Sequence, residues 1–447
     1  MGTRTCGHLL LMAATFLAGC AEGDGDDGGR IAVSDAHKEA VVLLTAEWGG
    51  SWPTGLDPAT NTTARANLSQ MNAIFGGLFQ LAPTDADFEI VGVLAENYEI
   101  VDEGRTLVIR LRRGVRFSEG TPLNAEAVEF NIVRNLSKPC TCSPSGWPWV
   151  KESPVTVLDD RTVALHFTRP YAPVIHAFPG SNVNWIASPT ALREMGEERF
   201  KLTPVGAGPF KVVSNELSTR LVLERNPTYW QSGKPHLDRL IFQSIGGEQA
   251  AYQALLAGDA HAFEGMTSTP LIVQAQQDPR LVVTEQPPTS PYVIQLNTTR
   301  PPFDDKRARE AIYYATNVDA IREGLFQNRY PLSQSFSGPG GIFHHERIDG
   351  YRAYDPERAR AIVDELGGVS ITLGTLRSFV AEQVITALQS QWRQAGIEVS
   401  IATYDVAPLI DRFQSGNWHA MLQTAGSYDP EAGASVSFRF RSDQRYT

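Results

Sequence analysis

The chain has 447 residues, which at about 100–200 residues a domain predicts two or three domains. Its composition is that of a globular protein, with 42% hydrophobic and 20% charged residues. Its formal charge of −11 at pH 7 argues against a nucleic-acid surface, which would be basic. After the N-terminus, no run is long and apolar enough for a membrane-spanning helix, which needs about 20 residues.

Residues 1–19 have the pattern of an export signal. Arg4 precedes the apolar run 9–17, and two small residues come directly before Cys20. The motif "LAGC" is similar to the bacterial lipobox, in which the cysteine becomes the lipid-carrying first residue of the mature protein. The alternative is an ordinary secretory signal with a chance cysteine. Residues 20–38 begin Gly-rich and acidic, which predicts a flexible tether behind the lipidated cysteine.

Two further cysteines, Cys140 and Cys142, lie in "KPCTCSPSGWPW". An exported protein can form disulfides, so one loop disulfide and two free thiols both stay open. A zinc site would need a second pair of ligands. We therefore expect a structural role for these cysteines in a loop.

The first half of the chain shows strand patterns broken by helices. "EAVVLLTAE" predicts the first strand. "LAENYEIV" and "TLVIRLRR" predict a hairpin across a Gly-bearing turn, followed by a helix that Asn124 caps and that carries the apolar stripe Val128, Ile132 and Leu136. Two more strands, "TRLVLER" and "LDRLIFQSI", precede a helix that stops near Gly258 and a short strand.

The stretch "VVTEQPPTSPYVIQL" (282–296) has two strand-like runs interrupted by prolines, which predicts a short crossing between lobes. Beyond it, strands and helices alternate. Helices are expected over 305–326, over 355–368 behind the cap Asp355, and over 381–396. The strands "VSITLGTL", "IEVSIATY" and "WHAMLQTA" lie between the later helices and complete an α/β lobe with a mainly parallel sheet.

Catalytic and cofactor motifs are missing from the sequence. It contains no nucleophile elbow, no zinc-protease helix motif and no phosphate-binding glycine loop. The run 206–210, "GAGPF", contains proline and does not open a helix. His344 and His345 stand beside Glu346 in a polar loop, where adjacent side chains do not converge on one metal. We therefore predict no catalytic residue, no metal and no cofactor.

Aromatic side chains follow the first and last predicted strands. Trp48 and Trp52 come just after the first strand, and Tyr428 comes just after the last. Ligands of α/β sheets bind beyond the carboxyl ends of strands, which makes these residues candidate ligand contacts. The alternative is that they are half-buried packing groups, as most aromatic residues are.

Several motifs follow one another in a recognisable order: "LDPATN", "LAENYEIVDEGRTLVIRLRRGVRFSEGTPLNAEAVEFNI", "VGAGPFKVV", "LERNPTYWQSGKPHLDRLIF", "ALLAGDAHAF", "PPFDDKRAREAIYYATNVDAI", "YDPERARAIVDELG" and "LQSQWRQAGIEVSI". This series resembles solute-binding protein family 5, the extracellular dipeptide, oligopeptide and nickel-type receptors of bacterial ABC importers. The resemblance covers almost everything after the tether.

The resemblance implies an α/β fold of the periplasmic-binding-protein type, a type II-like clamp of two lobes that closes on its ligand. Lobe one would span 39–286, with an extra subdomain at about 66–201, and lobe two would span 287–447. Relatives run further and return to lobe one, so we expect lobe two to be truncated here. The implied partners are a small-molecule or peptide ligand, the permease and ATPase subunits of an ABC importer, and the membrane through the lipid anchor, with no nucleic acid and a monomeric chain.

We predict ligand contacts at Trp48, Trp52, Thr62, Tyr292, Thr424, Ser427, Tyr428 and Asp429. Peptide receptors of the family typically carry an aspartate before the "DP" of "TAGSYDPEAG", where it neutralises the peptide's amino group. Gly426 or Ser427 stands there in this chain, so a dipeptide cargo is not implied. Asp429 could take a cationic group, or it could serve the turn beside Pro430.

The resulting function is a lipid-anchored extracytoplasmic protein, not an enzyme, that captures a peptide-like or other small organic solute for ABC-transporter uptake. Two alternatives remain open at this point. One is an extracytoplasmic hydrolase on the same fold, and the other is a solute sensor lipoprotein without an importer.

Overall fold

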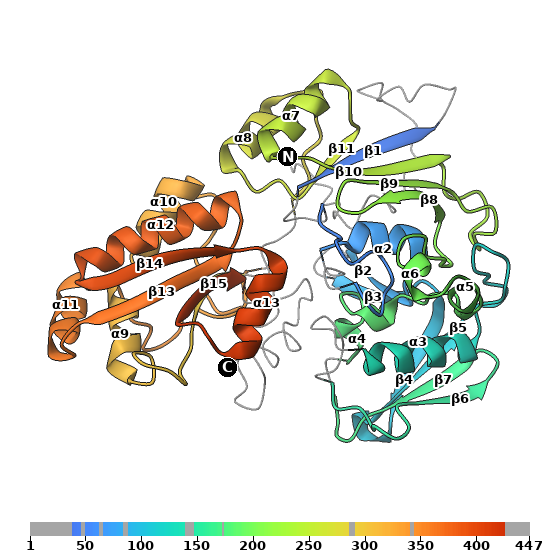
Figure 1. Cartoon of the computed structure of the whole chain (residues 1–447), viewed down its shortest axis with the longest axis horizontal. Coiled ribbons are helices and arrows are strands. Elements are labelled where there is room, and N and C mark those ends of the chain that lie inside the picture. Colours follow the sequence, from blue (N-terminus) through green and yellow to red (C-terminus); the bar gives the residue numbers. More distant parts are fainter. Residues whose placement is uncertain are drawn as a thin grey trace, which may run out of the picture. The chain divides into compact units, whose positions relative to one another are not determined.

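The computed structural model describes residues 38–45, 50–61, 66–83, 88–138, 147–171, 174–285, 291–339 and 344–424. The chain divides into two compact units (Figure 1). Unit 1 comprises Met1–Met266 and Pro270–Gln286, and unit 2 comprises Thr267–Thr269 and Pro287–Thr447.

The main sheet of unit 1 has the strand order β11-β1-β10-β9-β8. Its strands are β1 (Glu39–Leu44), β8 (Phe210–Glu216), β9 (Arg220–Arg225), β10 (Arg239–Ser244) and β11 (Ala262–Glu264). β1 runs parallel to both its neighbours, β10 and β11, whereas β10, β9 and β8 pair antiparallel. The strands predicted from apolar runs at β1, β9 and β10, and the short strand after Gly258, are confirmed, whereas β8 was not predicted.

Helices cover both faces of this sheet because β1 is apolar at consecutive positions. Val42 and Leu44 belong to a core that includes α2 (Leu68–Phe75). Leu43, on the opposite face, packs with Ala251 of α7 (Glu248–Ala257). A further helix, α8 (Thr269–Gln277), joins α7 in a small apolar cluster around Tyr252.

A second sheet of unit 1 has the order β4-β5-β7-β6 and is antiparallel throughout. Its strands are β4 (Ala95–Val101), β5 (Thr106–Leu111), β6 (Val155–Asp159) and β7 (Thr162–His166). The helix α3 (Ala125–Ser137) packs on β6 and β7 (Figure 1). The Asn124 side chain accepts from the Ala127 amide at 3.1 Å, which confirms the predicted cap. Val128 and Ile132 are fully buried and Leu136 is half-buried, as the apolar stripe predicts.

A two-stranded sheet, β2 (Phe79–Pro83) with β3 (Phe88–Gly92), adjoins an aromatic cluster of unit 1. Phe79 contacts Phe178 edge-on at 5.4 Å, and Phe178 contacts Trp147 at the same distance. Trp147 stacks on Trp149 at 5.5 Å. The remaining short helices of unit 1 are η1 (Asp102–Gly104), α4 (Val174–Ala177), η3 (Asn182–Asn184), α5 (Pro189–Met195) and α6 (Glu197–Phe200).

Unit 2 is built on a sheet of order β12-β15-β13-β14. Its strands are β12 (Tyr292–Leu296), β13 (Val369–Leu376), β14 (Ile397–Tyr404) and β15 (Ala420–Thr424). β13 is parallel to β14 and to β15, and only β12 pairs antiparallel, so the mainly parallel sheet is confirmed. The strand-like run at Val282–Glu285 forms no strand, and Val282 is 83% exposed.

The helices of unit 2 are α9 (Lys306–Ala315), α10 (Val318–Phe326), α11 (Pro356–Glu365), α12 (Phe379–Gln394) and α13 (Val406–Ser415). One face of the sheet packs against α12 and α9, and the other packs against α13 through Phe413 and Trp418. The single helix predicted over 305–326 is wrong, because the helix breaks between α9 and α10. Asn317 begins the second helix by accepting from the Ala320 amide at 2.9 Å. No helix among the residues described above is long and apolar enough to cross a membrane.

Candidate functional site

Three parallel strands of unit 1 end at one edge of the main sheet. β1, β10 and β11 end at Leu44, Ser244 and Glu264, and Leu44 lies opposite both of the other two. Ligands of such sheets bind beyond the carboxyl ends of parallel strands. This edge, with the described residues 50–61 that follow β1 in the chain, is the candidate site of unit 1.

Glu264 provides a carboxylate at this edge. Both of its oxygens lie within hydrogen-bond distance of the Ser69 hydroxyl of α2, at 2.8 and 2.6 Å. The carboxyl group is densely surrounded by protein, although the residue as a whole keeps part of its surface exposed. This burial raises the pKa of Glu264 to about 7, because desolvation disfavours the charged form more than Ser69 favours it.

Ser69 is positioned by asparagines at the start of α2. Asn61 donates to the Asn67 side chain at 3.3 Å, and Asn67 donates to the Ser51 carbonyl at 3.2 Å. Both asparagines are fully buried. These bonds join the loop 50–61 to the first turn of α2, so that the hydroxyl facing Glu264 comes from a fixed backbone.

The same loop is held by a buried ion pair. Arg134 of α3 donates two hydrogen bonds to the Asp57 carboxylate, at 2.7 and 2.6 Å. The Asp57 side chain is fully buried and that of Arg134 is 8% exposed. Glu197 accepts from Lys138 at 3.0 Å and from Arg134 at 3.3 Å, and these two cations lower its pKa. A bidentate pair of this kind fixes both groups in one geometry.

Trp52, which we predicted as a ligand contact, lies in the core of unit 1. Its side chain has no exposed surface. The indole N–H donates to Asn215 at 2.8 Å, and the Trp52 amide donates to the Ser218 hydroxyl at 2.9 Å. In this structure its surroundings are those of a packing group that anchors the loop after β1.

In unit 2, the corresponding edge carries two of the predicted contacts side by side. β13, β14 and β15 end there, and β12 begins there. Tyr292 lies directly opposite Thr424 in the β12–β15 ladder, and Tyr292 is 42% exposed. Nearby, the Thr375 hydroxyl donates to the Leu422 carbonyl at 3.1 Å and ties β13 to β15.

The other predicted site residues lie outside the described residues. They are Cys20, Trp48, Thr62, Ser427, Tyr428 and Asp429. Cys140 and Cys142 lie outside them as well. Their roles stay predictions.

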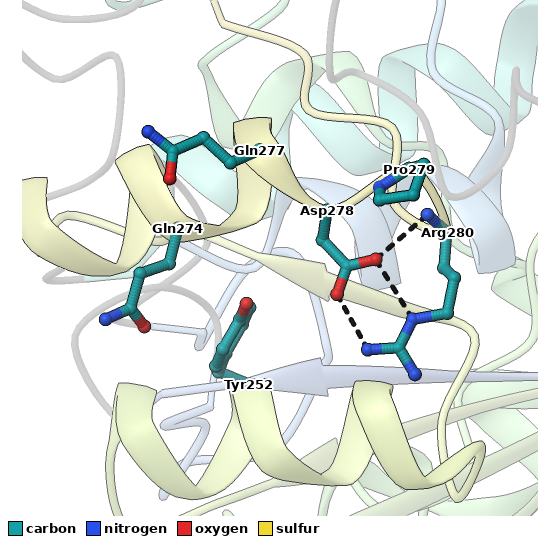
Figure 2. A pocket seen from close by; sticks show the side chains of 6 residues that line it. All are labelled: Tyr252, Gln274, Gln277, Asp278, Pro279 and Arg280. Atoms are coloured by element: carbon teal, nitrogen blue, oxygen red, sulfur yellow. Dashed lines mark hydrogen bonds and ion pairs between the residues drawn. The ribbon is translucent and has the colours of Figure 1, made fainter.

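A surface hollow of about 480 Å³ in unit 1 lies between Tyr252, in the middle of α7, and the C-terminal end of α8. Figure 2 shows Tyr252 on one side of it and the pair Asp278–Arg280 on the other. Arg280 donates to Asp278 at 3.0 and 2.7 Å, and this pairing lowers the pKa of Asp278 to about 2. Because Asp278 and Arg280 already form an ion pair with each other, the hollow is a weaker candidate for a ligand-binding site than the strand edge of unit 1.

The described part of the chain contains no group of three or more His, Cys, Asp or Glu residues that could hold a metal ion. His344 is engaged locally, with Nδ1 3.2 Å from the Ser337 carbonyl oxygen.

Comparisons with known proteins agree on fold and family. The model of the bacterial extracellular solute-binding proteins, family 5 Middle, matches residues 89–446. The glutathione-binding protein GsiB of Pectobacterium atrosepticum is 29% identical over 378 residues, which cover 83% of this chain and 70% of that protein. GsiB of Escherichia coli K12 is 29% identical over 377 residues with the same coverage.

Among solved structures, MoaA of A. tumefaciens R10 in complex with mannopinic acid superimposes with a TM-score of 0.77 at 22% identity, covering 92% of this chain and 83% of that one. OppA of Haemophilus influenzae, in complex with the peptide RPPGFSPFR, gives a TM-score of 0.73 at 18% identity, covering 92% and 84%. These likenesses show the α/β fold of periplasmic binding proteins, as the motif order implied.

The family match extends over most of the chain and includes the strands and helices of both units beyond residue 89. The chain therefore belongs to the bacterial extracellular solute-binding proteins, family 5. This confirms the resemblance drawn from the ordered motifs.

Proposed function

We propose that the chain is a lipid-anchored extracytoplasmic binding protein that captures a peptide-like or other small organic solute for uptake by an ABC importer. The observation that carries this proposal is the family match over residues 89–446. The relatives differ in cargo: two are named as glutathione-binding proteins, and two were solved with mannopinic acid and with a peptide. The solute class is therefore proposed broadly, and no turnover of the solute is expected.

The proposed ligand contacts are those predicted above: Trp48, Trp52, Thr62, Tyr292, Thr424, Ser427, Tyr428 and Asp429. The pairing of Tyr292 with Thr424 at a strand edge supports this set. Trp52 is a weaker candidate for a ligand contact than Tyr292 and Thr424, because its side chain is fully buried. The proposed division is a lobe of residues 39–286, with its subdomain at about 66–201, and a lobe of residues 287–447.

The anchor and the partners rest on the sequence. The "LAGC" motif supports lipidation of Cys20 after removal of residues 1–19. The acidic, Gly-rich stretch after it supports a tether that leaves the folded part free to meet its partners. The proposed partners are the permease and ATPase subunits of an importer, with the receptor acting as a monomer.

A ligand panel tests the proposal. The full-length chain is screened by thermal shift with di- and tripeptides, glutathione and sugar–amino acid conjugates, and each hit is titrated by calorimetry. We expect at least one solute to bind with 1:1 stoichiometry and to be recovered unchanged by mass spectrometry. Absence of binding across the panel, or conversion of a bound solute, would count against a receptor.

A further inference from the structure

Two buried carboxylates of unit 1, those of Asp57 and Glu264, differ in whether a cation neutralises them. Asp57 is neutralised by the two-pronged contact with Arg134. Glu264 forms no ion pair with any Lys, Arg or His that the structure describes, and among those residues its hydrogen-bond partner is the neutral Ser69 hydroxyl. A buried charge normally requires a counter-charge, so a buried carboxylate without one among the described residues calls for an explanation.

The described elements that adjoin Glu264 offer no cation of their own. α2 has the sequence "LSQMNAIF", without a charged residue. β1 has the sequence "EAVVLL", and its one charge, Glu39, stands at the opposite end of the strand from Leu44, which faces Glu264. The carboxylate therefore has acceptor capacity to spare, because a carboxylate offers about four lone-pair directions and one hydroxyl hydrogen fills one of them.

The position of Glu264 suits a ligand contact. It is the last residue of β11, at the edge where three parallel strands end. Part of the residue remains exposed, although the carboxyl group itself is densely surrounded by protein. The Ser69 hydroxyl comes from a helix start that the Asn61–Asn67 bond holds in place. A carboxylate that is fixed, shielded from water and uncompensated is a strong acceptor for a cationic nitrogen.

We propose that Glu264, oriented by Ser69, is the counter-charge for a cationic nitrogen of the solute, an ammonium or a guanidinium group. This inference rests on the proposed function and narrows it to solutes that carry such a group. Glu264 would also provide an acidic ligand contact in unit 1. The sequence "TAGSYDPEAG" of unit 2 lacks one, because it has Gly426 or Ser427 in place of the aspartate expected of peptide receptors.

The test compares matched pairs of probes on the wild-type chain and on Glu264→Gln. The pairs are trialanine with N-acetyl-trialanine, glutathione with its N-acetyl derivative, and arginine-containing dipeptides with their citrulline counterparts. We expect wild type to bind at least one charged member and to discriminate against its neutral partner. Glu264→Gln should weaken binding of the charged member by about 30-fold or more, because it removes one side of a buried charge pair.

Two further variants separate a ligand role from a structural one. Ser69→Ala keeps the carboxylate and should weaken binding by a smaller factor, while Glu99→Gln removes an exposed charge elsewhere in unit 1 and should leave binding unchanged. Without ligand, Glu264→Gln should melt no lower than wild type, since it removes an uncompensated buried charge.

The outcomes distinguish the two proposals. Binding that does not discriminate between charged and neutral probes, or that survives Glu264→Gln intact, overturns the role of Glu264 and leaves the receptor function standing. A ligand-free Glu264→Gln chain that melts clearly lower than wild type also overturns it. Failure of wild type to bind any probe, charged or neutral, contradicts both.

Discussion

Arg134 helps to hold residues 50–61 in place, because it is the counter-charge of the fully buried Asp57 carboxylate. We expect Arg134→Gln to lower the free energy of unfolding by about 3–5 kcal/mol, since it leaves Asp57 buried and unpaired. Chemical denaturation measures the change. Arg105→Gln is the matched control, because its ion pair with Glu103 is exposed and should contribute less than about 1 kcal/mol. Similar, small losses in both variants would contradict the assignment.

Glu264 should make stability depend on pH in a defined direction. Burial raises its pKa from 4.5 to about 7, so the folded state keeps a proton that the unfolded state releases. The stabilisation is complete below the unfolded pKa and is lost as pH rises through about 7. As the pH rises from 4.5 to about 7, we expect the unfolding free energy of wild type to decrease relative to that of Glu264→Gln. The decrease should amount to about 3 kcal/mol at most. Parallel curves for the two proteins in urea titrations across this range would refute the shift.

Single residues were the hardest level to predict from sequence. The Asp57–Arg134 pair joins positions 77 apart, and no local pattern links them. Glu264 ends a strand of three residues without a motif, so its lack of a counter-charge emerges only from the packing of α2 and β11. Trp52 was predictable as an aromatic group near a strand end, but the sequence alone left contact and core open.

At the scale of elements, the run "GAGPF" is a site of close backbone contact between a loop and α2. A Cβ on Gly206 would stand 2.3 Å from the Ile74 carbonyl oxygen and 2.6 Å from the Phe75 ring. We expect Gly206→Ala to destabilise the chain by about 1–3 kcal/mol, because the nearest clashing atom is a backbone carbonyl oxygen, which cannot move away by a side-chain rotation. Thermal or chemical unfolding tests this expectation.

Gly246→Ala is the control for that substitution. A Cβ at Gly246 would meet nothing within 4 Å. Its effect should stay within about 0.5 kcal/mol, as for ordinary surface changes. If both variants unfold alike, close packing against α2 is not the reason for glycine at position 206.

Elements were largely predictable because their signals are local. Asn124 and the stripe behind it specify α3 within a few residues, and β5 follows from strict alternation. The break between α9 and α10 was missed because the apolar spacing continues across it. Two tertiary bonds decide it: Gln391 of α12 accepts from the Asn317 amide at 2.8 Å and donates to the Asn317 carbonyl at 3.1 Å.

At the scale of the whole molecule, the ordered motifs predicted family and fold, because they record which elements occur and in what sequence. Cargo is a different matter, since it depends on loops beyond the strands. The candidate edge of unit 1 combines residues from α2, β1 and β11 that lie far apart in the sequence, and Ser69 and Glu264 alone are separated by 195 positions. Such a combination is visible only once the chain is folded.

The proposed anchor makes a prediction about the whole chain in a bacterial host. We expect mature protein to begin at Cys20, to carry fatty acyl groups and to fractionate with membranes. Cys20→Ser should remove the acyl mass and release the protein from the membrane fraction, with the unfolding transition unchanged. Wild-type protein that is cleaved elsewhere and carries no lipid would favour the ordinary secretory signal.

Native mass spectrometry of the full-length chain, purified without denaturation and again after unfolding and dialysis, tests the receptor function most directly. The account predicts one small organic solute per chain in the first sample, carrying an ammonium or guanidinium group, and its loss in the second. It predicts that adding the solute back restores the bound mass. A bare chain mass in both samples, with no adduct after exposure to the ligand panel, would contradict it.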